Sequence, residues 1–151
     1  MNFEQLKLEN QLCFPLYAAA KEVVKAYTPL LAPLGLTYTQ YIVLLVLWEK
    51  KCTSVKDLGE VLLLDSGTLT PVLKRLEKQG LIGRNRSRED ERLLIVSLTE
   101  QGETLKEKAS SIPGKISSCV PLDASDAKEL YRILYTLLGS TAKISTQEVL
   151  P

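Results

Sequence analysis

Three cysteines are the residues of this chain best suited to redox or metal chemistry. Cys13, Cys52 and Cys119 are odd in number, lie far apart and form no CxxC pair, which argues against both a disulfide framework and a thiolate zinc site. The chain contains no histidine, so imidazole metal ligands and Ser-His or Cys-His nucleophile pairs are excluded. We therefore expect free thiols, no metal, no cofactor and no hydrolytic activity.

Cys13 lies where a helix is expected to begin. Pro15 fits only the opening turn of a helix, and Pro29 is expected to end it, so the sequence predicts a helix from Leu12 to about Pro29. Unpaired amides and the helix dipole favour a thiolate in a first turn. A thiolate reacts with a peroxide to give a sulfenic acid, which a second thiol captures as a disulfide. The alternative is a buried, inert cysteine.

The elements that must position such a residue are mainly α-helical, with one small β-hairpin. A length of 151 residues with 45% hydrophobic residues suits a single domain spanning residues 1–151. Hydrophobic periodicity, caps and turn residues predict the following elements after the first helix. They are helices at Thr39–Trp48, from Ser54 to Leu62 and from about Gly67 to Gln79, strands at Ile82–Arg86 and Leu93–Leu98, and helices from Gln101 to about Cys119 and from Ala124 to about Gly139.

Basic and hydroxyl side chains gather on the fourth helix and the hairpin. The net charge is only +1, but residues 74–92 hold seven basic and four acidic residues. Two short helices joined by a tight connection are predicted, and the second has a polar outer face. This arrangement matches the geometry by which a recognition helix enters the DNA major groove. The alternative is an ordinary solvated surface. We predict DNA contacts by helix residues Ser66, Thr68, Thr70, Lys74 and Arg75, and by hairpin residues Arg84, Arg86 and Arg92.

Three stretches resemble the MarR family in order and spacing: DSGTLTPVLKRLE from Asp65, GLI from Gly80 and DERLLIVSLT from Asp90. The resemblance covers about Leu8 to Leu138. It implies a winged helix-turn-helix homodimer, with dimerisation helices at about 8–30 and 100–139 and a DNA-binding winged helix at about 39–98. It also implies that Asp90 orients Arg92 towards the minor groove. A two-fold dimer implies an inverted-repeat operator in double-stranded DNA.

Within that family, the stretch NQLCFPLY, residues 10–17, is similar to the organic hydroperoxide regulators and to staphylococcal oxidation sensors. Tyr17, Tyr27 and Tyr38 follow Cys13 by 4, 14 and 25 residues, as does the tyrosine set that surrounds the reactive thiol in that subfamily. Phenol hydroxyls that donate to sulfur lower its pKa. Cys119 resembles the resolving thiol of two-cysteine sensors. The one-cysteine alternative, in which a small cellular thiol resolves Cys13, stays open, and Cys52 is interpreted as an incidental loop residue.

These resemblances imply a redox-sensing transcription regulator, a repressor that leaves its operator when an organic hydroperoxide or a related oxidant oxidises Cys13. One alternative is a MarR-type repressor released by a small aromatic ligand, with Cys13 not a sensor. A thiol peroxidase and a purely structural module are disfavoured. The longest apolar run, Ile42 to Trp48, is too short to cross a bilayer, and residues 1–20 lack the pattern of a signal peptide. We expect a cytoplasmic protein without membrane contact.

Overall fold

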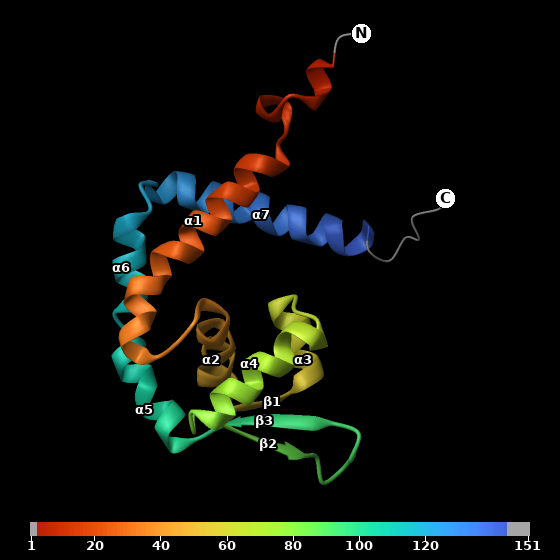
Figure 1. Ribbon diagram of the computed structural model, residues 1–151, viewed down its shortest axis with the longest axis vertical. Coiled ribbons are helices and arrows are strands. Elements are labelled where there is room, and N and C mark those ends of the chain that lie inside the picture. The colour runs from red at the N-terminus through yellow and green to blue at the C-terminus, as the bar shows by residue number, and fades with distance from the viewer. Residues whose placement is uncertain (1–2, 145–151) are drawn as a thin grey trace. The chain divides into compact units, whose positions relative to one another are not determined.

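The computed structural model describes residues 3–144, and the side chains of residues 3–139. The chain divides between Ile116 and Ser117 into two compact units, whereas the sequence predicts one domain. In chain order, the elements are the 3-10 turns η1 (Glu4–Leu6) and η2 (Leu8–Asn10), α1 (Cys13–Leu31), the 3-10 turn η3 (Ala32–Leu34), α2 (Tyr38–Lys50), β1 (Cys52–Ser54), α3 (Val55–Leu62), α4 (Ser66–Lys78), β2 (Ile82–Arg86), β3 (Leu94–Leu98), α5 (Glu100–Ala109), α6 (Ile112–Cys119) and α7 (Ala124–Ile144) (Figure 1). The predicted mainly helical winged fold is confirmed.

Helix α2 forms the centre of the core in the first unit. Its run of apolar residues is buried on more than one face, and Val43, Leu44 and Leu47 are fully buried. A capping box starts the helix: the backbone N–H of Gln40 donates to Thr37 Oγ1, and the backbone N–H of Thr37 donates to Gln40 Oε1. Helices α3, α4 and α5 and the sheet all contact α2. The DNA-facing elements predicted from the sequence therefore rest on one buried helix.

The connection between α3 and α4 is a tight turn. Leu63 takes a left-handed conformation with φ 53°, and the Leu64 N–H donates to the Gly59 carbonyl at 2.9 Å. A Cβ on Gly59 would lie 2.8 Å from the Leu64 carbonyl oxygen, so the turn can close only over a glycine. The predicted helix-turn-helix is confirmed, with Ser54 and Asp65 as the N-caps of its two helices.

The hairpin belongs to a three-stranded antiparallel sheet of order β1-β3-β2. Arg86 pairs with Leu94 at the outer end of the β2–β3 ladder, and Ile82 pairs with Leu98 at its root. The third strand, β1, was not predicted, and the interpretation of Cys52 as a loop residue is wrong: Cys52 pairs with Ser97 of β3 at the sheet edge. Three residues carry too little alternation to predict a strand.

Proline positions account for two further corrections. Helix α1 continues past Pro29 to Leu31, because a proline near a helix end removes only one backbone bond and buried Leu31 holds the last turn in the core. The single helix predicted from Gln101 to Cys119 is broken: α5 ends at Ala109 and α6 starts at Ile112. Pro113 cannot donate a backbone bond to the preceding turn and its ring crowds the carbonyl four residues back.

The second unit consists of the end of α6 and helix α7. The Asp126 N–H donates to Asp123 Oδ1 at 2.8 Å, which confirms Asp123 as the cap. Helix α7 extends to Ile144, past the predicted end at Gly139.

Among the described residues, no single helix is long and apolar enough to cross a membrane; residues 13–34 and 38–50, bent by 73°, pass the length and composition test only as a pair.

Candidate functional site

The outer face of α4 is available to a large ligand. Leu69, Leu73 and Leu76 bury the opposite face in the core, so the helix presents the other side to solvent. All five helix residues predicted to contact DNA are exposed on it: Ser66, Thr68, Thr70, Lys74 and Arg75. Within the described part of the chain, Lys74 and Arg75 form no ion pair. The structure therefore places two uncompensated cations one turn beyond three hydroxyl groups.

Asp65 organises the N-terminus of α4. Its carboxylate accepts from the Thr68 N–H at 2.9 Å and from the Thr68 hydroxyl at 3.0 Å. Both bonds lower the pKa of Asp65, and the bond from the Thr68 backbone N–H has the larger effect. The sequence prediction had not included Asp65 among the functional residues, although an aspartate three residues before a threonine at a helix start is a capping signal. Because Thr68 donates its hydroxyl proton to Asp65, the Thr68 oxygen is left to accept.

Arg84 braces the wing against α4. Its guanidinium donates to Glu77 Oε2 from Nε at 3.0 Å and from Nη2 at 2.5 Å, and the side chain is 19% exposed. The hydrogen bond from Arg84 lowers the pKa of Glu77, and the positive charge adds to this. The guanidinium of Arg84 is thus engaged in an ion pair with a residue of α4. No such ion pair is formed, among the described residues, by Arg86 or Arg92, the other wing arginines predicted to contact DNA.

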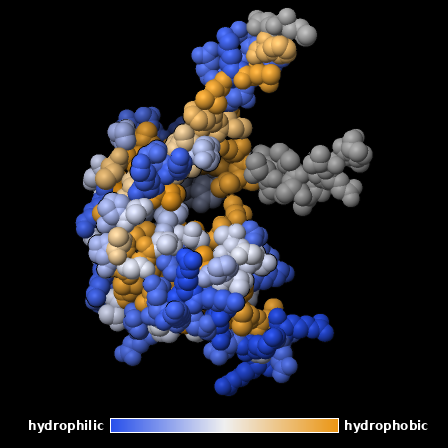
Figure 2. All heavy atoms as spheres, in the orientation of Figure 1, coloured by the Kyte–Doolittle hydropathy of each residue, from blue (hydrophilic) through white to orange (hydrophobic). Residues whose placement is uncertain are grey.

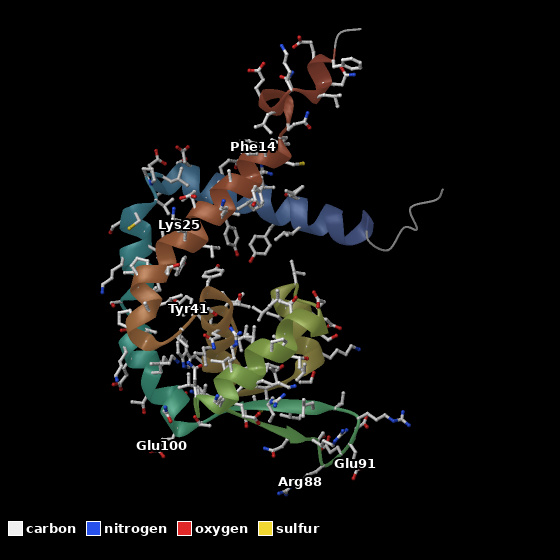
Figure 3. The ribbon with its side chains drawn as sticks, viewed as in Figure 1. Phe14, Lys25, Tyr41, Arg88, Glu91 and Glu100 are labelled. Atoms are coloured by element: carbon white, nitrogen blue, oxygen red, sulfur yellow. The ribbon has the colours of Figure 1, made fainter. Side chains whose placement is uncertain are left out.

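The tip of the wing carries the remaining charged residues. Arg86 Nη1 donates to the Glu91 carbonyl at 2.6 Å, and Asp90 Oδ1 accepts from the backbone N–H of Arg92 at 2.9 Å. Asp90 therefore fixes the turn through the Arg92 backbone, while the predicted orientation of the Arg92 guanidinium stays a prediction. Arg88 and Glu91 project from the tip (Figure 3). The surface of this part of the molecule is mostly hydrophilic, with hydrophobic atoms among the hydrophilic ones (Figure 2).

Cys13 is the first residue of α1 and is exposed. No side chain of the described residues caps this helix start at Leu12. Of the residues that follow Cys13 in the first turn, Phe14 already donates its backbone N–H to the Gln11 carbonyl at 3.3 Å and Pro15 has no N–H. The helix dipole is therefore the influence that favours a negative charge on sulfur here. Tyr17 follows one turn later and is 64% exposed. The predicted location of the thiol at a helix N-terminus is confirmed.

The other two predicted tyrosines lie together, far from Cys13 of the same chain. The ring centroids of Tyr27 and Tyr38 are 4.8 Å apart, where the end of α1 meets the start of α2. Tyr27 lies 14 residues after Cys13 on one continuous helix, which corresponds to about 21 Å along the axis at 1.5 Å per residue. One chain therefore cannot bring Tyr27 to its own thiol.

Tyr41 extends this cluster and was missed by the sequence prediction. Its ring lies 5.8 Å from that of Tyr27, and its position three residues after Tyr38 on α2 places both on one helix face, which was the available signal. Burial, with the neighbouring phenols, raises the pKa of Tyr27 and of Tyr41. Both therefore remain protonated at neutral pH and keep a hydroxyl proton to donate.

The other cysteines are separate from this cluster along the chain. Cys119 is the last residue of α6 and lies in the second unit, and Cys52 lies on the edge strand; both are exposed. Among the described residues, no group of three or more His, Cys, Asp or Glu side chains is placed to hold a metal ion.

Comparison with known proteins identifies the family. Residues 25–109 match the sequence profile of a family described as transcriptional regulator SarA/Rot. The chain is 57% identical to the organic hydroperoxide resistance transcriptional regulator of Bacillus subtilis over 136 residues, which cover 90% of this chain and 92% of that protein. This relative is a transcriptional regulator and not an enzyme.

Solved structures show the same fold. Reduced AbfR bound to DNA superimposes with a TM-score of 0.80 at 38% identity, covering 95% of this chain and 99% of that chain. Disulfide-formed AbfR superimposes with a TM-score of 0.63 at 40% identity, covering 89% and 95%; AbfR is a protein of Staphylococcus epidermidis. Wild-type MarR of Escherichia coli, at 24% identity, shares the fold with a TM-score of 0.67 over 85% of this chain and 96% of that one. The predicted family resemblance is confirmed, and the chain belongs to the SarA/Rot family of transcriptional regulators, with a MarR-type winged helix-turn-helix.

Proposed function

We propose that this protein is a homodimeric, redox-sensing repressor that binds an inverted-repeat operator when reduced and releases it when an organic hydroperoxide oxidises Cys13. One observation carries the proposal: an exposed thiol at the N-terminus of α1, in a chain 57% identical to an organic hydroperoxide resistance regulator. A DNA-binding regulator with free thiols acts in the cytoplasm, where thiols are kept reduced.

DNA recognition falls to α4 and the wing. In this proposal α4 enters the major groove, with Ser66, Thr68 and Thr70 near base edges and Lys74 and Arg75 on phosphates. Wing residues Arg86 and Arg92 reach the adjacent backbone or minor groove, and Asp90 shapes the turn that carries them. Arg84 contributes by holding the wing in position through Glu77.

Two features support a second copy of this chain as the partner. Large apolar side chains are left exposed on both helices predicted to dimerise: Phe14, Leu16, Val23 and Val24 on α1, and Leu130, Ile133, Leu137 and Leu138 on α7. Surfaces of this kind mark protein–protein interfaces. In addition, this proposal has Tyr27 and Tyr38 support a Cys13 thiol, and the distance along α1 leaves only the thiol of the other subunit for that contact. The two compact units of each chain would form one MarR-type domain within the dimer.

The chemistry at Cys13 balances without a cofactor. The thiolate attacks the terminal oxygen of the hydroperoxide, the O–O bond breaks, sulfur takes the hydroxyl group as a sulfenic acid, and the alkoxide leaves and takes up a proton to become an alcohol. A second thiolate then attacks the sulfenic sulfur, forms the disulfide and releases hydroxide, which takes up a proton to become water. Phenol hydroxyls of Tyr27 and Tyr38 would donate to the reactive thiolate and position it.

Cys119 of the other subunit is the resolving thiol in this proposal. Its support is its exposure together with the existence of a disulfide-formed structure of the relative AbfR. A disulfide between the α1 and α6 regions would shift the two recognition helices relative to each other. A loss of about 100-fold in operator affinity requires only about 2.8 kcal/mol of preference for the DNA-competent arrangement.

The test is a titration of operator DNA with reduced protein, before and after treatment with cumene hydroperoxide, for the wild type, Cys13→Ser and Cys119→Ser. Cys52→Ser is the matched control, because Cys52 is also exposed but lies on an edge strand. Release of the wild type and of Cys52→Ser, but not of Cys13→Ser, supports the sensor. Release of Cys13→Ser equal to the wild type refutes it, and a reducible covalent dimer that is absent only from Cys13→Ser and Cys119→Ser identifies the resolving thiol.

A further inference from the structure

A single side chain at the end of the recognition helix contacts both sides of the junction that holds the tyrosine cluster. Gln79 is the C-cap residue of α4. Its Nε2 donates to the Gly35 carbonyl at 2.8 Å, and its Oε1 accepts from Gln40 Nε2 at 3.2 Å. Gly35 ends the 3-10 turn that follows α1, and Gln40 is the third residue of α2. One amide therefore joins three helical elements.

The tyrosine rings pack at that same junction. Tyr27 lies one turn before the end of α1, and Tyr38 is the first residue of α2, with the ring centroids 4.8 Å apart. Gly35, with φ 68°, provides the left-handed turn between them. A rearrangement of these rings would change the angle at which α2 starts from the end of α1, and both sides of that angle are hydrogen-bonded to Gln79.

We infer that the chain Gln40–Gln79–Gly35 transmits the oxidation of the thiol sensor to the recognition helix, with Gln40 and Gln79 as positioning residues that do not touch the oxidant or DNA bases. This inference rests on the proposed function, because it needs an operator affinity that depends on Cys13 oxidation. It adds the path by which the tyrosine cluster and α4 are coupled within one subunit.

Burial makes the Gln40 amide a directional link. Gln40 is 4% exposed, and its Oε1 already accepts the Thr37 N–H at 2.8 Å, so its Nε2 must point at Gln79. A buried amide cannot replace a lost partner with water at little cost. Gln40 therefore moves with the start of α2, and in this inference it carries the exposed Gln79 side chain with it through their hydrogen bond.

Two other hydrogen bonds to this end of α4 are accepted by backbone carbonyls and not by the Gln79 side chain. Gln101 Nε2 donates to the Gln79 carbonyl at 3.2 Å, and Thr99 Oγ1 donates to the Gly80 carbonyl at 2.7 Å. These bonds attach α5 and its cap to α4 without contacting the Gln79 side chain. Gln101 thus offers a matched control for a side-chain relay.

Gln40→Glu is the sharpest test variant, because it changes one atom of the relay and keeps the helix cap. Glutamate preserves the oxygen that accepts the Thr37 N–H and is the usual partner in a capping box. It replaces the donor facing Gln79 Oε1 with a second acceptor. Rotation of the Gln79 amide would restore that contact only by turning its oxygen towards the Gly35 carbonyl. Gln79→Glu is the complementary variant, since it keeps the bond to Gln40 and removes the donor to Gly35.

The experiment measures operator affinity before and after stoichiometric cumene hydroperoxide, and separately the rate at which Cys13 loses its thiol titre. We expect both relay variants to oxidise at the wild-type rate, while their loss of affinity on oxidation falls from about 100-fold to below about 10-fold. Gln101→Glu keeps the wild-type loss. Thermal unfolding of each variant verifies that it is folded. A purely structural role would lower the stability of the variant, and it would not leave the oxidation rate of Cys13 unchanged while reducing the release of DNA.

Four results would overturn the inference. Release of both relay variants equal to the wild type refutes the relay and leaves the proposed function standing. A slower oxidation rate in the variants refutes it as well, because the effect would then lie at the thiol. An equal effect of Gln101→Glu shows a general loosening of α4 instead of a relay. Failure of the wild type to release DNA refutes the proposed function, and this inference with it.

Discussion

Gly102 of α5 lies so close to the root of the wing that a methyl group has no room there. A Cβ at this position would lie 2.2 Å from the Leu81 carbonyl oxygen and 2.8 Å from Leu98 Cδ1. The Gly102 carbonyl also accepts the buried indole N–H of Trp48 at 2.9 Å. We predict that Gly102→Ala strongly destabilises the protein, because it separates α5 from the sheet and from α2 together.

The magnitude follows from these distances. An ordinary carbon-to-carbonyl-oxygen contact is at least about 3.3 Å, so the backbone of α5 or of Leu81 must move by about 1 Å. Such overpacking costs roughly 2 kcal/mol, and loss of the Trp48 hydrogen bond adds about 1 kcal/mol. A total of about 3 kcal/mol lowers the Tm of a chain of this size by about 6–12 °C.

Thermal unfolding followed by circular dichroism, with the reduced protein at fixed concentration, measures this change. Gly114→Ala is the matched control, because a Cβ on Gly114, in α6, meets nothing within 4 Å. The control should be neutral or slightly stabilising, since alanine favours a helix over glycine by up to about 1 kcal/mol. A Tm of Gly102→Ala within about 2 °C of the wild type would contradict the reasoning from these contacts.

Three further predictions concern charge. In a dimer, Lys74→Ala removes one phosphate contact per subunit, so the slope of log affinity against log salt concentration becomes shallower by about 1.8, and an unchanged slope would exclude Lys74 from the phosphate contacts. Glu77→Gln releases Arg84 from its brace and should steepen that slope; no change in salt dependence would mean that Arg84 stays away from DNA even when released. The lowered pKa of Asp65 means that its charge stabilises the fold above its ordinary value of 3.8 and that this effect is lost as pH falls through the lower folded value. Asp65→Asn should therefore be less stable than the wild type in urea at neutral pH, and the difference should vanish in acid; a difference that persists there would point to a cause other than charge.

The helix-turn-helix and the wing could be predicted because local signals agree with the tertiary fold. Ser54 and Asp65 lie directly before their helices, Gly80 has the left-handed φ of 74° expected after α4, and the strands β2 and β3 have the predicted periodicity and turn. The limits of α1 and α5 were wrong because a proline has opposite effects at different positions. Pro29 is tolerated near a helix end where Leu31 is buried, and Pro113 accompanies the break before α6.

The candidate site was predictable by residue type and much less by contact. The resemblance to the organic hydroperoxide regulators selected Cys13, Tyr17, Tyr27 and Tyr38, but no local pattern shows that Tyr27 packs on Tyr38 while remaining about 21 Å along α1 from the thiol. The pairing of Arg84 with Glu77 joins a strand to a helix seven residues earlier. The contact between Gln40 and Gln79 spans 39 residues. Long-range side-chain pairs of this kind depend on the packed fold and leave no periodic signal in one sequence.

Trp48 gives the protein an optical reporter of its own. It is the only tryptophan in the chain, it is 6% exposed, and its indole lies 6.2 Å from the Tyr41 ring while it bonds to Gly102 of α5. Its fluorescence therefore depends on the junction of the tyrosine cluster with α2 and α5, and no added label is needed. Emission recorded in a stopped-flow mixer after hydroperoxide addition can follow the movement of α2 in real time, separately from the loss of the thiol and from the departure of DNA.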